Sequence, residues 1–366
     1  INISYRFHQI VIIITLYLIF CLNLDGLIST LVKNNTALIQ EFSESKQIAI
    51  ITHVNPDGDA VGSGLALYHF FKKTNHKPFL ISPNEVPEFL RWLPGGDLIK
   101  VFDDDSEGTG QIILNADIII NIDFNVLNRI EDIKPYILDS EARRIVIDHH
   151  PIDSDYANYL IAKTEVSSTA ELVYEFIHGF PITNKLDKSI AECIYTGIMT
   201  DTVDFKYNVH QRTFLILSDL MNYHINIEKV HTNIYDKFSI ERMQLMGYSL
   251  YKRLVVLSEY KTAYIYLSKE DQERFNFKTG DSEGFVNLPL SIKNIRFSAL
   301  FMEKDDITKI SFRSKGNFPV NQFSAKYFNG GGHTNAAGGR IELNLHDTIK
   351  KFQDLLPIFK DELMNT

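Results

Sequence analysis

The sequence RRIVIDHHP, residues 143–151, is an apolar run rich in β-branched residues that ends abruptly in a carboxylate and two imidazoles. Pro151 has no backbone N–H to donate, so a central strand must end before it. Open α/β sheets bind their ligands at the carboxyl ends of their strands. The sequence therefore predicts a buried strand that presents Asp148, His149 and His150 at a functional site.

Two other apolar runs end in the same way. QIAIIT, residues 47–52, leads into His53 and the turn-forming loop VNPDGD, residues 54–59. ADIIINI, residues 116–122, leads into Asp123. Helical patterns separate these runs, which predicts βαβ units and hence a parallel sheet. We therefore expect three buried parallel strands, each with Asp or His at its carboxyl end.

The composition is typical of a globular protein with more than one domain. The chain has 366 residues, which is more than one ordinary core accommodates, and 45% of them are hydrophobic. The net charge of -9 argues against binding nucleic acid through overall charge, so a polyanionic substrate needs local cations. The two cysteines, Cys21 and Cys193, exclude a disulfide framework and a thiolate zinc site.

An apolar appendage occupies residues 1–26. Within it, residues 10–22 are apolar except for Thr15, a length typical of a signal-peptide core and short for a membrane span of about 20 residues. Three interpretations stay open: an upstream extension of the gene model, since the chain begins with Ile; a signal or membrane anchor; or a packed part of the fold. We expect a cytoplasmic protein, or a membrane-anchored one if the run is an anchor.

The period of the hydrophobic pattern divides the rest of the chain. Residues 27–210 alternate helical patterns with buried strands, which predicts an α/β domain with a doubly wound, mostly parallel sheet. Residues 211–240 show helical patterns without a strand, which is typical of a helical linker. Residues 241–366 begin with a helix and continue in alternating strands such as IRFSALF at 295–301, which predicts a smaller α/β domain with a mixed sheet.

Six side chains qualify as metal ligands, and they are His53, Asp57, Asp59, Asp123, His149 and Asp201. Oxygen and imidazole donors without thiolate suit Mn²⁺ or Mg²⁺ before zinc. One ion rarely needs four carboxylates, whereas two ions about 3.5–4 Å apart do, with one carboxylate between them. Asp123, alone at its strand end, is the natural bridge. Such a pair of ions acidifies a shared water and neutralises a phosphoryl group during transfer.

Each of these residues taken alone has an ordinary structural explanation. A strand-end aspartate such as Asp57 or Asp123 often only caps a helix, and a lone His53 is more often a satisfied loop histidine. His149 beside His150 is harder to explain in this way, because buried imidazoles need partners. Their coincidence at successive strand ends favours a metal site. The acidic run at 103–105, by contrast, is typical of a solvated loop.

A second cluster lies in the C-terminal domain. FNGGGHTNAAGG, residues 328–339, contains Gly330, Gly331, Gly332 and His333. Glycines let the backbone approach a ligand closely and can form an anion-binding nest, although such a run can equally be a tight turn. Arg313 and Ser314 end a predicted strand, where a guanidinium can bind phosphate bidentately. Together these residues predict a phosphate-binding site.

These motifs resemble those of the DHH phosphoesterases. The first domain carries that family's four motif positions in HVNPDGD (53–59), Asp123, DHH (148–150) and Asp201, and residues 313–314 and 330–333 are similar to its DHH-associated C-terminal domain. The likeness covers about residues 45–345 and is greatest to the bacterial oligoribonuclease and pAp phosphatase branch. One difference is visible: Val203 follows Thr202 where the family often has glycine, which affects the loop rather than the ligand.

The resemblance implies a role for each site residue. His53 and Asp57 would hold a first ion, and Asp59, His149 and Asp201 a second, with Asp123 bridging; the usual ion is Mn²⁺. His150 would contact the scissile phosphate, and Asp148 would support the two histidines. A third set would bind the distal phosphate or base of the nucleotide, namely Arg313, Ser314, Gly330, Gly331, Gly332 and His333.

The expected function is therefore metal-dependent hydrolysis of short oligoribonucleotides or of the bisphosphate nucleotide pAp. We expect no binding of long duplex nucleic acid, and we allow for a homodimer. Cleavage of linear or cyclic dinucleotides, pApA or c-di-AMP, is an alternative within the same class. A non-catalytic nucleotide sensor is the alternative of another class; loss of a metal ligand would favour it, yet all six candidates are present.

Overall fold

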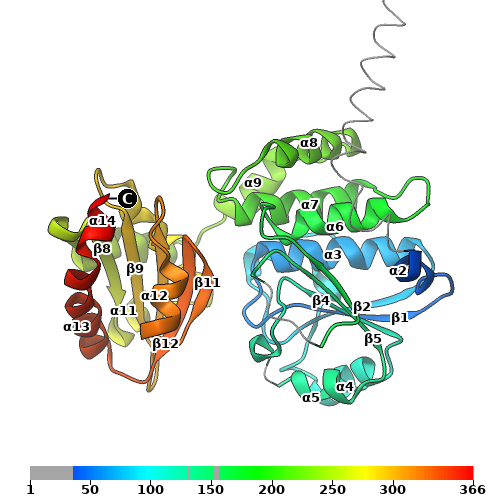
Figure 1. The fold of residues 1–366 in the computed structure, drawn as a ribbon, viewed down its shortest axis with the longest axis horizontal. Coiled ribbons are helices and arrows are strands. Elements are labelled where there is room, and N and C mark those ends of the chain that lie inside the picture. The colour runs from blue at the N-terminus through cyan, green and yellow to red at the C-terminus, as the bar shows by residue number, and fades with distance from the viewer. Residues whose placement is uncertain (1–35, 131, 152–155, 366) are drawn as a thin grey trace, which may run out of the picture. The chain divides into compact units, whose positions relative to one another are not determined.

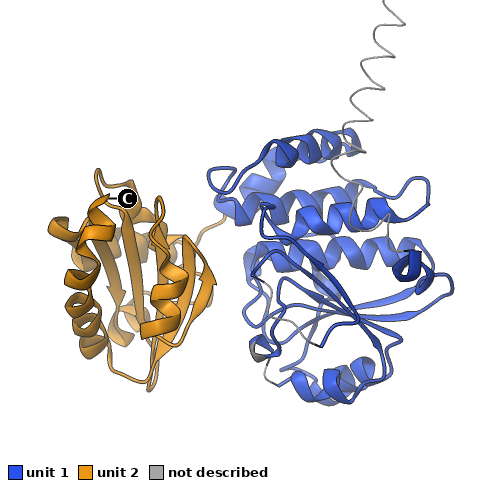
Figure 2. Cartoon of the chain, in the orientation of Figure 1, with its two compact units in different colours: residues 1–236 blue, residues 237–366 orange. Residues whose placement is uncertain are grey.

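The computed structural model describes residues 36–130, 132–151 and 156–365. The chain divides after Asp236 into two compact units (Figure 2). The apolar run at residues 10–22 and the predicted appendage 1–26 lie outside the described residues. Within the part of the chain that the structure describes, no helix has the length and apolar character needed to cross a membrane.

Unit 1 is built on a six-stranded parallel sheet, which confirms the predicted doubly wound fold. The strand order is β3-β2-β1-β4-β5-β6, and each neighbouring pair is parallel. The strands are β1 (Gln47–Ile51), β2 (Lys77–Ser82), β3 (Lys100–Val101), β4 (Ile118–Ile122), β5 (Arg143–Asp148) and β6 (Tyr159–Ala162). The chain leaves β1 toward β2 on one side and returns through β4 on the other. The carboxyl ends of β1, β4 and β5 therefore meet where such sheets open a crevice.

Helices cover both faces of this sheet (Figure 1). On one face lie α3 (Gly58–Lys73), α6 (Thr169–Gly179) and α7 (Lys188–Asp201), and on the other α4 (Ser106–Leu114) and α5 (Lys134–Asp139). Their apolar side chains form two buried cores. The short elements are α2 (Thr36–Gln40), η1 (Glu88–Leu90), η2 (Gly96–Leu98) and η3 (Leu127–Arg129). The connection between β4 and β5 contains η3 and α5, and α5 begins at Lys134 because Pro135 fits only the first turn of a helix.

The segment 211–236 belongs to unit 1 rather than forming a free linker. It folds into α8 (Gln211–Leu220), η4 (Met221–Tyr223) and α9 (Ile227–Tyr235). Ile216, Leu220, Val230 and Ile234 are all buried in the core of unit 1. A helix that buries one apolar face must pack against a core, so this segment cannot be a spacer.

Unit 2 contains a second six-stranded sheet, in the order β11-β12-β10-β9-β8-β7. The strands are β7 (Leu254–Leu257), β8 (Thr262–Leu267), β9 (Phe297–Glu303), β10 (Thr308–Ser314), β11 (Gly331–His333) and β12 (Ala336–Ile341). The β8–β9 pair is parallel and the other pairs are antiparallel, which confirms the predicted mixed sheet.

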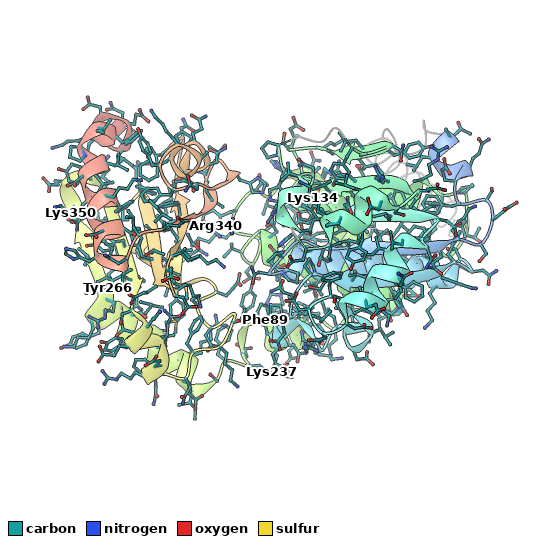
Figure 3. The ribbon with its side chains drawn as sticks, turned by 90° about the horizontal axis from the view of Figure 1, so that it is seen from below. Phe89, Lys134, Lys237, Tyr266, Arg340 and Lys350 are labelled. Atoms are coloured by element: carbon teal, nitrogen blue, oxygen red, sulfur yellow. The ribbon has the colours of Figure 1, made fainter. Side chains whose placement is uncertain are left out.

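Helices also cover both faces of the second sheet. An aromatic core lies under α12 (Val320–Tyr327), α13 (Leu345–Leu355), η8 (Leu356–Phe359) and α14 (Lys360–Asn365). The outer side of α13 carries exposed residues such as Lys350 (Figure 3). The other face is covered by α10 (Ile240–Tyr248) and η7 (Phe285–Ser291). The remaining elements are a π-helical turn η5 (Ser249–Arg253), η6 (Ser258–Tyr260) and α11 (Lys269–Arg274).

Candidate metal centre

The six candidate metal ligands lie at the carboxyl edge of the parallel sheet. His53 follows β1, and Asp57 and Asp59 stand at the start of α3. Asp123 directly follows β4 and His149 directly follows β5, while Asp201 ends α7. The donor atoms form two groups, each within 4.8 Å: His53 with Asp57 and Asp123, and Asp59 with His149 and Asp201.

Asp123 lies between the two groups. Its Oδ2 is 3.3 Å from His53 Nε2, and its Oδ1 is 3.6 Å from His149 Nε2. The backbone of Asp123 has a φ of 64°, in the left-handed region that aspartate tolerates better than most residues. The guanidinium of Arg129 donates to the Asp123 carbonyl oxygen at 3.2 Å, which helps to hold this conformation. The carboxylate thus turns one oxygen toward each group of ligands.

Asp57 and Asp59, in the loop after β1, are each held by backbone N–H groups at the start of a helix. Asp57 caps α3, with its Oδ1 accepting from the backbone N–H groups of Asp59 and Ala60 at 3.0 Å each. The buried Asp59 carboxylate faces the start of α6, where it accepts from Thr169 N at 2.6 Å and Ala170 N at 2.9 Å. These contacts hold both carboxylates in place without any ion.

His150 and Asp148 form a hydrogen-bonded pair beside Asp123. The distance from His150 Nδ1 to Asp148 Oδ1 is 2.7 Å, and the side-chain amide of Asn125 donates to the other oxygen of Asp148. Burial disfavours the charged imidazole, but the hydrogen bond to Asp148 and the charges of Asp123 and Asp148 outweigh it and raise the pKa of His150 to about 9. In the metal-free site His150 is therefore a cation at neutral pH.

The carboxylates of the centre are too crowded to be charged together without added cations. Burial, followed by the charges of Asp123, Asp201 and Asp57, raises the pKa of Asp59 far above its ordinary value. Burial, with Asp57 and Asp123 adding to it against the effect of His149, raises the pKa of Asp201 to about 6. Asp123 moves the other way: burial opposes its charge, yet the hydrogen bond with His53 and the nearby imidazoles lower its pKa. The pKa of Asp148 is lowered as well, because its hydrogen bond with His150 outweighs burial.

This crowding, together with the donor set, fits divalent cations. Four carboxylates and two imidazoles converge, with no thiolate among them, and their mutual repulsion is the condition that bound cations relieve.

The residues expected to bind substrate lie in unit 2. In the strand register Arg313 pairs with Ala336, and Ala336 pairs in turn with His333, so the three share one face of the sheet. The small Ala336 leaves room between the two longer side chains. Ser314 is buried, donating to the Phe318 carbonyl oxygen at 2.7 Å and accepting from the Asn335 amide at 2.8 Å. Its hydroxyl thus serves the fold of the loop.

Two glycines of the run, Gly331 and Gly332, lie in the short strand β11, which pairs with β12. Both are exposed, and a side chain at Gly331 would meet open space. Gly332 has a φ of 136°, and a Cβ there would lie 2.5 Å from the Ala336 carbonyl oxygen. Only glycine fits this position.

Two residues of the centre did not emerge from the sequence. Asn125 orients Asp148, and Thr169 contacts both Asp59 and Asp123. The signal for Thr169 was present in SSTAE, residues 167–171, but this motif predicts only a helix start, which Ser168 provides. Asn125 has no comparable local signal.

Fold and site define a class: a two-domain α/β protein with an aspartate–histidine centre at the open edge of a parallel sheet. The N-terminal domain of the DHH family matches residues 47–198, and the DHHA1 domain matches residues 259–364. The chain therefore belongs to the DHH family, as the resemblance implied.

Similar proteins cover almost the whole chain. The bifunctional oligoribonuclease and PAP phosphatase NrnA of Bacillus subtilis is 30% identical over 84% of this chain and 93% of that protein. NrnA of Thermus thermophilus is 25% identical over 86% and 90%, respectively. Among solved structures, an exopolyphosphatase-related protein from Bacteroides fragilis is 41% identical, with a TM-score of 0.85 over 90% of this chain and 96% of that chain.

Proposed function

We propose that this protein is a di-metal phosphoesterase that hydrolyses short oligoribonucleotides and pAp. The observation that carries the proposal is the orientation of Asp123, which turns one oxygen toward His53 and the other toward His149. Two relatives named as bifunctional oligoribonucleases and PAP phosphatases, similar over nearly their full lengths, support the substrate class.

In this proposal the two groups of ligands hold one ion each. His53 and Asp57 would hold the first, Asp59, His149 and Asp201 the second, and Asp123 would bridge them. Mn²⁺ is the preferred ion and Mg²⁺ the alternative. When bound, two such cations supply an activated water and neutralise charge on the phosphoryl oxygens.

The side chains beside the ions would act on the phosphate directly. His150, whose ring is hydrogen-bonded to Asp148, would contact an oxygen of the scissile phosphate. Asp148 is held in turn by Asn125, so the ring of His150 keeps one orientation. In unit 2, the row formed by Arg313, Ala336 and His333 beside the glycine run would bind the distal phosphate or base.

The test measures phosphate release from pAp and cleavage of an RNA pentamer with Mn²⁺, comparing the parent with Asp123→Asn. Asparagine tolerates the left-handed backbone, so the variant removes charge without adding strain. We expect a loss of roughly 100-fold or more. Asp104→Asn, the same change in an exposed loop, is the matched control and should keep the parental rate. Equal rates in the parent and Asp123→Asn would refute the di-metal proposal.

A panel of pAp, pApA, c-di-AMP and short RNAs at one Mn²⁺ concentration then ranks the substrates. Faster turnover of pApA than of pAp would favour a dinucleotide phosphodiesterase, and nucleotide binding without turnover would favour a sensor. Homodimer formation, absence of binding to long duplexes and a cytoplasmic location stay predictions, which sedimentation, duplex titration and cell fractionation respectively address.

A further inference from the structure

Thr169, the first residue of α6, joins the two groups of candidate ligands. Its side chain is fully buried, and its hydroxyl donates to Asp123 Oδ1 at 2.7 Å. Its backbone N–H donates to Asp59 Oδ2 at 2.6 Å. One residue therefore contacts the carboxylate between the two groups through its side chain and a carboxylate of the second group through its backbone.

The start of α6 is shaped to receive Asp59. Ala170 donates its backbone N–H to Asp59 Oδ1 at 2.9 Å, so both oxygens of this carboxylate face the helix start, where backbone donors and the helix dipole favour an anion. On the other side, α7 approaches closely at Gly197. A Cβ there would lie 2.7 Å from the Ala170 Cβ and 3.0 Å from Asp59 Oδ1.

The start of α6 is also anchored from outside the centre. Ser168 caps the helix, and Ser167 donates its hydroxyl to Glu171 Oε1 at 2.6 Å. The guanidinium of Arg212, at the start of α8, bonds Glu171 Oε2 at 2.9 Å. These contacts involve buried groups one turn or less from Thr169, so its hydroxyl and N–H are held at fixed positions relative to the sheet.

We propose that Thr169 is a positioning residue for the two proposed metal ions, acting through the carboxylate of Asp123. A carboxylate that serves two ions needs its plane fixed so that each oxygen faces one of them. Donation from Thr169 to Oδ1 fixes that rotation, and Oδ2 then faces His53. Partners of this kind, which orient a ligand without touching the metal, typically contribute 10- to 100-fold in metal affinity or activity. The inference rests on the proposed function, in which this site holds two metal ions.

Thr169→Val tests it, because valine keeps the shape and the backbone N–H and loses only the hydroxyl. Thr169→Ser restores the hydroxyl. Thr348→Val is the matched control: Thr348 is a buried threonine in the first part of α13, and its hydroxyl bonds the Asn344 carbonyl oxygen at 2.8 Å. Mn²⁺ binding is measured by calorimetry, and coupling between the two ions by electron paramagnetic resonance. Thermal melting of the metal-free protein monitors folding.

We expect Thr169→Val to keep a cooperative thermal transition without metal, at a moderately lower melting temperature because the buried Asp123 loses a hydrogen bond. It should bind its Mn²⁺ pair roughly 10- to 100-fold more weakly and show altered coupling. Thr169→Ser and Thr348→Val should stay within about threefold of the parent. Parental binding and coupling in Thr169→Val would overturn the inference, as would a parent that binds fewer than two Mn²⁺ ions. If the parent protein binds two coupled Mn²⁺ ions but hydrolyses none of the nucleotides, the proposed function is refuted. The comparison of Mn²⁺ binding between the parent and Thr169→Val still decides the role of Thr169.

Discussion

Replacing Asp201 by Asn should stabilise the metal-free protein at neutral pH, although it removes a proposed ligand. The carboxyl of Asp201 has a pKa of about 6 in the folded protein against an ordinary value of 3.8, mainly because it is buried among other carboxylates. The folded state therefore binds more protons than the unfolded chain between these values, and stability falls as the pH rises through them. At pH 4 the folded carboxyl is protonated and the unfolded one is about 40% protonated, so the effect is only about 0.6 kcal/mol.

The magnitude follows from the difference between the two pKa values. Each pH unit corresponds to 1.36 kcal/mol, so the charged Asp201 costs about 3 kcal/mol above pH 6. The side chain is 27% exposed, so solvent screens part of this cost, and about 3 kcal/mol is an upper limit. For a unit of this size the gain in Asp201→Asn corresponds to roughly 6–12 °C in melting temperature. The pKa of Asp59 is also raised, partly by the charge of Asp201, and this repulsion disappears in the variant.

The assay is thermal melting in a metal chelator at pH 4, 5, 6 and 7, for the parent, Asp201→Asn and the exposed-loop control Asp104→Asn. The stabilisation by Asp201→Asn should grow from about 0.6 kcal/mol at pH 4 to nearly its full value at pH 7, while the control stays flat. The lowered pKa of Asp123 and the raised pKa of His150 act mainly outside this window and are shared by both proteins. With saturating Mn²⁺ at pH 7 the order should reverse, because the parent then has the additional ligand. Equal melting temperatures at pH 7 without metal, or a gain that does not depend on pH, would refute the reasoning.

Three further predictions concern backbone strain, a buried ion pair and the glycine run. Val203 has a φ of 52°, costly for a β-branched residue, so Val203→Asn should stabilise by about 1 kcal/mol in thermal melts; a loss would contradict the strain. Arg212→Gln leaves the buried Glu171 without its cation and should lower the free energy of unfolding in urea by roughly 3–5 kcal/mol, whereas a loss below about 1 kcal/mol would mean that water replaces the guanidinium. Gly332→Ala places a Cβ against a β12 carbonyl and should raise KM for pAp roughly tenfold with little change in kcat; an unchanged KM would remove this run from substrate binding.

The central strands could be predicted from sequence because each is an apolar, β-branched run that ends in polar residues. β1, β4 and β5 have this form, and parallel pairing brings their carboxyl ends to one edge. The proximity of the six candidate ligands follows from that topology, although their binding of ions stays a prediction. The edge strands β3 and β6 have two and four residues, which is too few to show a period, so no sequence pattern indicated them.

The boundary between the units was harder to predict for a different reason. The helical pattern of residues 211–236 shows that an apolar face exists, but not which core covers it. Residues such as Ile216 and Val230 bury that face in unit 1, where the sequence predicted a separate linker. The hydrophobic period predicts a helix, but the core against which the helix packs depends on contacts with residues distant in the chain.

The same limit explains why Thr169 was missed. The motif SSTAE, residues 167–171, is typical of a helix start, a local feature in which a side-chain oxygen accepts from a backbone N–H within one turn, and Ser168 is the residue that caps α6. The partners of Thr169 lie far away in the chain, and Asp59 precedes it by 110 residues. A capping motif shows that donors are available, but not which carboxylate they face.

This long separation has a consequence for the order of events during synthesis. The loop that carries Asp59 emerges from the ribosome well before α6, and a carboxylate buried there without the donors of α6 would be strongly unfavourable. The first loop can therefore take its final shape only after α6 has been made and has packed. In the proposed di-metal enzyme, metal would then be loaded late, completing an already assembled unit instead of nucleating its folding.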